Sequence, residues 1–147
     1  MTAQVPPGMP KRFPIFFSSR PVIRLKHPPR TSRGAAVAAT YEALLIGEQF
    51  GLDPELMTDV INASTGRSFA SELVVKEHAL TGKFASGFAM GLLAKDVRIA
   101  ADLAADIGVR SPYTNLTRDE FARGRDKVGF ARDFSELLLV MKEEKSG

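Results

Sequence analysis

Residues 92–107 read LLAKDVRIAADLAADI, and this stretch decides the fold of the chain. Projected at about 100° per residue, its apolar side chains fall on one broad face of a helix. Most of its charged side chains line the other face: Lys95, Arg98, Asp102 and Asp106. The pattern predicts the longest helix of the chain, from about Ser86 to Ile107, with Gly108 as its stop.

Asp96 is the exception in this pattern, because it projects into the middle of the apolar face. A buried carboxylate must find hydrogen-bond donors. We therefore expect Asp96 to accept hydrogen bonds from a neighbouring helix end or from a basic side chain. Its expected role is in packing rather than in chemistry.

Further helices are predicted on both sides of this one. Asp53 is an N-cap residue, and Pro54 and Glu55 suit the first helical turn that follows it. Asp133 and Glu136 have the spacing of a capping box. Together with glycine stops and short polar connections, these signals predict helices at Ala35–Phe50, Asp53–Ala63, Phe69–Leu80, Ser111–Val128 and Phe134–Glu143.

The predicted fold class is mainly α, a multi-helix bundle. Short connections between helices favour antiparallel neighbours, and no alternating β pattern of useful length is present. In the first of these helices, Tyr41, Glu42 and Glu48 are expected on a solvated or interface face.

Residues 1–33 differ from the rest of the chain. They hold seven of the nine prolines and seven basic residues, with no Asp or Glu. Because proline removes a backbone donor and disfavours helix in the residue before it, no helix is expected here. We interpret 1–33 as a disordered basic segment and 34–147 as the helical domain. A transit peptide or a non-native, frame-shifted stretch are the alternatives for the first part.

Composition excludes several classes of chemistry. Without cysteine there is no disulfide, thiolate nucleophile or thiolate-bound zinc, and two histidines predict no metal site. Residues 34–147 sum to −4, so no nucleic-acid partner is expected. No apolar run reaches the roughly 20 residues of a membrane span, and no secretory signal is evident, so we expect a cytoplasmic protein without a membrane partner.

Several motifs in order resemble a known family. They are Gly51-Leu52-Asp53, then Val60-Ile61-Asn62-Ala63-Ser64-Thr65-Gly66-Arg67-Ser68, then Leu93-Ala94-Lys95-Asp96-Val97-Arg98-Ile99-Ala100. Over residues 40–145 or so, the chain resembles the C-terminal domain of the 3-hydroxyisobutyrate dehydrogenase family. That β-hydroxyacid dehydrogenase family also includes tartronate semialdehyde reductases and is more distantly similar to 6-phosphogluconate dehydrogenase.

The resemblance implies a fold, a cofactor and binding residues. It implies a helical domain that follows a Rossmann domain, covers NAD or NADP and a small hydroxy-acid substrate, and takes part in a homo-oligomer. Lys95 would face the cofactor cleft with Phe88 near it, although lysine in such a position is otherwise usually solvated. The loop with Ser64, Gly66 and Arg67 combines hydroxyls, backbone donors and a guanidinium, which suits a substrate carboxylate, a subunit contact or an ordinary helix connection.

The chain departs from the family upstream of this domain. The family carries a catalytic lysine in a Gly-x-x-x-Lys-x-x-Asn-Asn segment, and Lys26 stands near the corresponding spacing. However, Pro29-Arg30 replaces the asparagine pair, and Pro28 and Pro29 argue against the helix that would orient the ammonium.

No Gly-x-Gly-x-x-Gly phosphate cradle occurs anywhere in the sequence. No intact catalytic residue is therefore expected. We expect a cofactor-covering and oligomerisation domain that binds no cofactor tightly and does not turn over by itself. The alternative function is a stand-alone helical dimerisation or interaction module with a basic tail.

Overall fold

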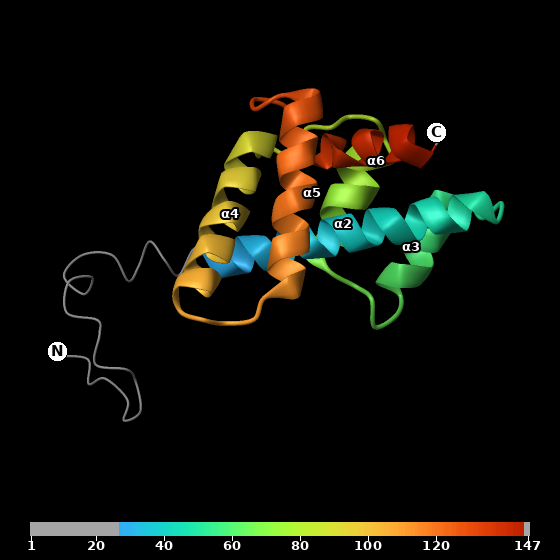
Figure 1. Ribbon diagram of the computed structural model, residues 1–147. Helices are drawn as coiled ribbons and strands as arrows, with labels where there is room; N and C mark the ends of the chain where they lie inside the picture. The colour runs from blue at the N-terminus through green and yellow to red at the C-terminus, as the bar shows by residue number, and fades with distance from the viewer. Residues whose placement is uncertain (1–26, 146–147) are drawn as a thin grey trace, which may run out of the picture.

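The computed structural model describes residues 27–145, and this part of the chain is helical (Figure 1). It contains no strand among those residues, only an isolated antiparallel bridge between Ala89 and Asp133. The elements in order are α2 His27–Gln49, α3 Pro54–Asn62, η1 Ala70–Ala79, α4 Met90–Asp106, α5 Pro112–Val128, η2 Phe134–Glu136 and α6 Leu137–Lys145. The predicted mainly α class is confirmed. Within 27–145 no helix is both long and apolar enough to cross a membrane.

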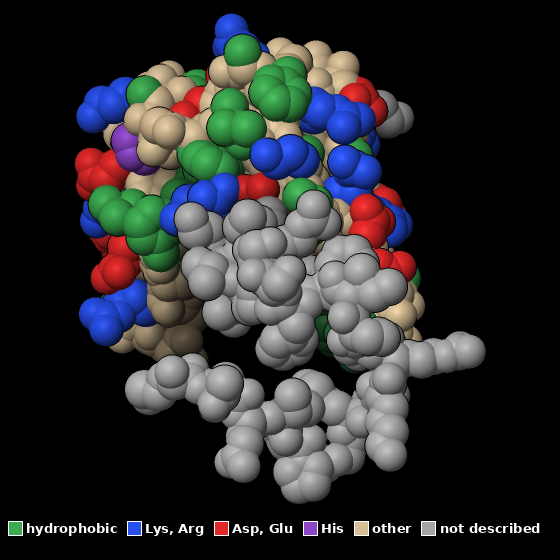
Figure 2. All heavy atoms as spheres, turned by 90° about the vertical axis from the view of Figure 1, so that its left-hand side faces the viewer, with side chains coloured by type: hydrophobic (Ala, Val, Ile, Leu, Met, Phe, Trp, Pro, Cys, Tyr) green, Lys and Arg blue, Asp and Glu red, His purple; other side chains and the backbone are tan. Residues whose placement is uncertain are grey.

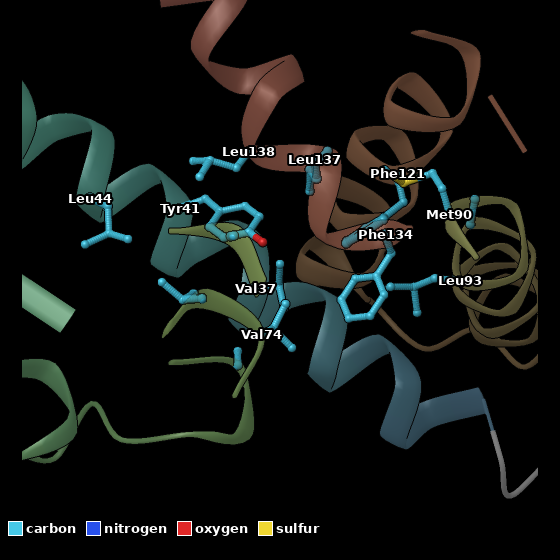
Figure 3. Packing of buried hydrophobic residues seen from close by; sticks show 14 of the residues in the cluster. Val37, Tyr41, Leu44, Val74, Met90, Leu93, Phe121, Phe134, Leu137 and Leu138 are labelled. Carbon is cyan, nitrogen blue, oxygen red and sulfur yellow. The ribbon is translucent and has the colours of Figure 1, made fainter. Parts of the chain in front are cut away.

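Helix α2 forms the axis around which the other helices pack. It contacts α3, η1, α4, α5 and α6, and in Figure 1 it passes behind α5 from the side of α4 to the side of α3. The core lies where these elements meet, and Figure 3 shows the side chains of α2, η1, α4 and α5 facing the start of α6. Its largest fully buried members are Tyr41, Phe121, Phe134, Leu44, Met90, Leu93 and Leu137.

The start of α2 corrects the expected domain boundary. The helix begins at His27, not at Ala35, so the interpretation of 1–33 as one disordered segment is wrong for 27–33. Pro28 and Pro29 fall in the first turn, where backbone N–H groups have no intrahelical acceptor and proline is tolerated.

Gly34 lies inside α2 where this helix crosses α5. A Cβ there would stand 3.0 Å from a ring carbon of Phe121 and 3.1 Å from the methyl of Thr117. The absence of a side chain at this position therefore allows the close approach of the two helices.

The start of α4 also differs from the expectation. The helix begins at Met90, because the preceding residues from Ser86 on are held in a loop by the carboxylate of Asp133. This carboxylate accepts from Ser86 Oγ at 2.7 Å, from the Gly87 N–H at 3.0 Å and from the Ser135 N–H at 3.0 Å. Asp133 thus caps η2 and fixes the loop at once. Burial alone would raise the pKa of Asp133, but these hydrogen bonds lower it overall.

The capping-box prediction at the last helix is confirmed only in part. Asp133 does cap η2, but the Glu136 side chain does not complete the box. Instead, both of its carboxylate oxygens accept from Arg132 Nε at 2.9 Å. The first turn is a 3₁₀ helix, and the α-helical part starts at Leu137.

Tyr41 is fully buried, which contradicts its expected place on a solvated or interface face. Its hydroxyl donates to the backbone carbonyl of Ser135 at 3.0 Å, so it joins α2 to η2 across the core. Figure 3 shows the Tyr41 side chain among the other buried residues. Burial, and then the nearby charge of Asp133, raise the pKa of Tyr41.

The helices between these two regions agree with their sequence signals. Asp53 caps α3 through hydrogen bonds from the N–H groups of Glu55 at 2.7 Å and Leu56 at 3.0 Å. The helix expected at Phe69–Leu80 is present as η1, but it is wound as a π-helix with bonds such as Leu80 N–H to Val75 O at 2.9 Å.

Candidate functional site

Asp96 lies on the buried face of α4 and binds an arginine from α2. Its side chain is 3% exposed, and Nη1 of Arg30 donates to its Oδ2. The Arg30 side chain is 39% exposed, so the ion pair lies at the edge of the core. The expectation that Asp96 accepts from a basic side chain is confirmed.

Phe88 packs against the same arginine. The Arg30 guanidinium carbon stands 4.9 Å from the centroid of the Phe88 ring, in cation–π geometry. The Phe88 ring in turn meets Phe134 edge to face, with centroids 6.3 Å apart and an interplanar angle of 76°. We call Arg30, Phe88 and Asp96 the Arg30 cluster. It joins the first turn of α2, the loop before α4, and α4 itself.

Lys95 precedes Asp96 on α4 and is exposed. Successive helical residues point in different directions, so Asp96 enters the core while the Lys95 side chain is exposed to solvent. Figure 2 shows the side of the molecule on which α4 lies in Figure 1, and Lys and Arg side chains lie there among apolar ones. The arrangement leaves Lys95 available to an anion, and its role toward a cofactor stays a prediction.

A second arginine–aromatic pair follows one turn later on α2. The guanidinium carbon of Arg33 lies 4.8 Å from the centroid of the Phe69 ring. Arg30 and Arg33 are three residues apart and so share one face of the helix. Phe69 directly follows the loop of residues 64–68, so this pair brings the end of that loop to α2.

The loop residues that are predicted to bind substrate contact residues that are near them in the sequence. Ser64 Oγ donates to the carbonyl of Ile61 at 3.0 Å, and Arg67 approaches the Glu72 carboxylate at 3.7 Å. A Cβ on Gly66 would stand 3.2 Å from the Ile61 side chain. These contacts hold the loop against α3 and η1. They do not join Ser64, Gly66 or Arg67 to the Arg30 cluster, so their substrate role stays a prediction.

Sequence reasoning missed Arg30 and Arg33, because it assigned both to the disordered basic segment. A signal was present: Asp96 needed a basic partner, and Arg30, Arg33 and Val37 continue the helical spacing upstream. Lys26 lies outside the described residues. No group of three His, Asp or Glu side chains in residues 27–145 has the arrangement of a metal site.

Comparison with known proteins extends these observations. Residues 33–141 match the family model described as "NAD-binding of NADP-dependent 3-hydroxyisobutyrate dehydrogenase". The 2-(hydroxymethyl)glutarate dehydrogenase of Eubacterium barkeri is 34% identical over 114 residues, which are 78% of this chain and 38% of that enzyme. A probable mitochondrial 3-hydroxyisobutyrate dehydrogenase of Arabidopsis thaliana is 29% identical over 106 residues, 68% of this chain and 30% of that protein. The chain thus spans about a third of the length of these relatives.

Solved structures share the fold at lower identity. A Mycobacterium tuberculosis 3-hydroxyisobutyrate dehydrogenase, solved with L-serine, superposes with a TM-score of 0.73 at 23% identity, covering 80% of this chain and 42% of that one. Psf3, solved in complex with NADP+ and 2-OPP, gives a TM-score of 0.70 at 24% identity, covering 80% of this chain and 41% of that one. With the family model matched over most of the helical domain, the chain belongs to the 3-hydroxyisobutyrate dehydrogenase family.

Proposed function

We propose that this chain is the domain that covers cofactor and substrate in an NAD(P)-dependent 3-hydroxyacid dehydrogenase. The substrate class is a small 3-hydroxy acid or its semialdehyde, of the 3-hydroxyisobutyrate or tartronate semialdehyde type. The observation that carries the proposal is the match of residues 33–141 to a family model defined by cofactor binding. The exposed Lys95, which directly precedes Asp96 of the Arg30 cluster on α4, supports it.

The side chains around Lys95 fit part of a dinucleotide. An exposed ammonium and the half-exposed guanidinium of Arg30 suit an anionic oxygen of the cofactor or substrate, and the Phe88 ring offers an apolar wall that excludes water. When bound, NAD(P) supplies the acceptor or donor for the hydride at the substrate's hydroxyl-bearing carbon.

The fit is incomplete, because the glycine-rich phosphate cradle of a Rossmann domain does not occur in the sequence. A nucleotide-binding domain is therefore the required partner. By itself the chain binds cofactor weakly and does not catalyse hydride transfer.

Self-association is the second part of the proposal. Apolar side chains that are each more than half exposed gather at the corner between α2 and α3: Phe50, Leu52, Leu56 and Val60. Such a surface is usually covered by another protein surface, and a second copy is the simplest occupant. The same corner supports the alternative of a stand-alone dimerisation module. The cytoplasmic location and the absence of nucleic-acid and membrane partners stay predictions, and several relatives are named as mitochondrial enzymes.

Titration of the isotope-labelled chain with NADP+ tests the cofactor role by NMR. We expect weak, saturable shifts centred on Lys95 and Phe88, and we expect Lys95→Ala to reduce them. Lys127→Ala is the matched control, since Lys127 is an exposed lysine at the C-terminal end of α5, which ends at Val128. Shifts centred elsewhere, or equal shifts in the Lys95→Ala chain, would contradict the proposal.

A further inference from the structure

A groove of about 590 Å³ lies between α2, α5 and α6. Three large apolar side chains line it while remaining mostly exposed: Ile46 at 56%, Leu116 at 69% and Tyr113 at 80%. On α2, Ala35, Ala38 and Ala39 also line the groove, and their small side chains leave room beside the helix. The groove shares no residue with Lys95 or the Arg30 cluster.

The charged side chains of the groove are mostly acidic. Glu42, Glu120 and Glu144 line it, with Arg123 as the only basic residue among the described lining side chains. Arg123 is already engaged, because it donates to both Glu120 and Glu144, and Lys127 from outside the lining pairs with Glu144 at 3.5 Å. The groove therefore combines an apolar surface with a net negative charge. Its chemistry favours an occupant that is both apolar and basic.

We propose that the occupant is the chain's own N-terminal segment, residues 1–26. This segment carries five basic and no acidic residues, and the whole chain carries +3, so the remaining residues sum to −2. It also contains an apolar run directly after Lys11 and Arg12, namely Phe13-Pro14-Ile15-Phe16-Phe17. The segment thus offers both properties that the groove requires, in adjacent residues.

The length of the segment permits this contact. From His27 the near end of the groove at Ala35 lies about 12 Å along α2, and the Leu45 position lies about 27 Å along it, at roughly 1.5 Å per residue. The nine residues between Phe17 and His27 can span roughly 30 Å when extended. Residues 13–17 can therefore reach the groove from the start of the helix.

The segment's position can be measured in the intact chain, because the sequence has no cysteine and one introduced thiol is labelled alone. A nitroxide on Ser19→Cys should broaden the NMR signals of groove residues such as Ile46 and Leu116. Leu116→Lys should abolish this broadening, since it replaces an apolar wall residue by a positive charge that repels the basic segment, and the Leu116 side chain is too exposed to be needed for folding. Added salt should weaken it.

Leu73→Lys is the matched control, because Leu73 is also an exposed leucine but lies outside the groove, on η1. It should leave the broadening unchanged. Mixing nitroxide-labelled chain with isotope-labelled, nitroxide-free chain separates the two sources of the occupant. Equal broadening in that mixture would assign the groove to a second copy and overturn the proposal, as would absence of broadening in the singly labelled chain. Neither result bears on cofactor binding, since the groove and Lys95 are separate.

Discussion

Arg30 in the first turns of α2 donates to the buried carboxylate of Asp96 on α4, 66 residues later in the chain. The pair joins the start of the long helix to the helix that carries Lys95. Because a buried carboxylate without donors is strongly disfavoured, this contact gives a physical reason for α2 to extend upstream of Gly34. It also sets the orientation of the surface where the cofactor is proposed to bind.

Replacing Arg30 should destabilise the chain. Arg30→Gln removes a charged donor from Asp96 and the stacking on Phe88. Since Arg30 is more than a third exposed, the expected loss is modest for an ion pair, about 1–2 kcal/mol in the free energy of unfolding. Urea denaturation measures it. Arg118→Gln, which breaks the exposed pair with Asp119, should leave stability unchanged, and an equal effect of both variants would contradict the assignment.

The same contact shows what a sequence can and cannot predict here. The helix of Asp53 and the helix from Ser111 followed from local signals, and they lie where those signals placed them. The starts of α2 and α4 did not, because each depends on a partner far along the chain: Asp96 for Arg30, and Asp133 for Ser86. Rules based on local sequence take account of proline and glycine, but they do not include the distant carboxylate that determines the conformation.

Tyr41 illustrates the same limit at the level of burial. Its helix is amphipathic only weakly, with alanines on several sides, so its apolar spacing did not distinguish the inner face. The hydroxyl partner, the carbonyl of Ser135, is 94 residues away. For the candidate site, the family motif could indicate Lys95 and Phe88, whereas Arg30 required knowledge of how α2 and α4 pack.

The buried phenol of Tyr41 should make the chain less stable at alkaline pH. Its pKa is raised in the folded chain, so above its ordinary value near 10 the unfolded chain loses this proton while the folded chain keeps it. Stability from this group is full below that pH and falls above it. Tyr41→Phe should cost about 1 kcal/mol at neutral pH through the lost hydrogen bond to Ser135, and it should flatten the alkaline decline.

Urea denaturation at several pH values between neutral and alkaline measures both effects for Tyr41→Phe. Tyr113→Phe serves as the control, because Tyr113 is the only other tyrosine and is exposed. A parallel alkaline decline in the wild-type chain and in Tyr41→Phe would contradict the expected linkage.

Asp133 should act at the opposite end of the pH range. Its pKa is lowered in the folded chain, so its contribution is full above the ordinary value near 4 and is lost as the pH falls through the folded value. Asp133→Ala removes the cap of η2 and the bonds to the loop at Ser86 and Gly87, at a cost of about 1–3 kcal/mol at neutral pH. The stability of the variant should also fall less steeply at acid pH than that of the wild-type chain.

Asp133→Asn keeps the shape of the side chain without its charge and should lie between the wild-type chain and Asp133→Ala in stability. Hydrogen exchange locates the effect, since the amides of Gly87 and Ser135 should lose protection together. Loss confined to one of these two amides would show that Asp133 does not couple the loop to η2.

Neighbouring residues of α4 should separate stability from function. Lys95 is exposed, so Lys95→Ala should keep the melting temperature, whereas Asp96→Ala should lower it by removing the buried partner of Arg30.

The kinetic effect can be measured in an enzyme rebuilt by joining this domain to the nucleotide-binding domain and catalytic lysine segment of a relative. In that enzyme, Lys95→Ala should lower kcat/KM about 5- to 150-fold. This corresponds to roughly 1–3 kcal/mol, the scale of a charge-assisted hydrogen bond. Lys95→Arg should recover part of the loss, because the charge is kept. Thermal melts and kinetics on the same variants test both statements. Unchanged kinetics for Lys95→Ala would show that this lysine is a solvated surface residue with no role in catalysis. An unchanged melting temperature for Asp96→Ala would contradict the structural importance of its pair with Arg30.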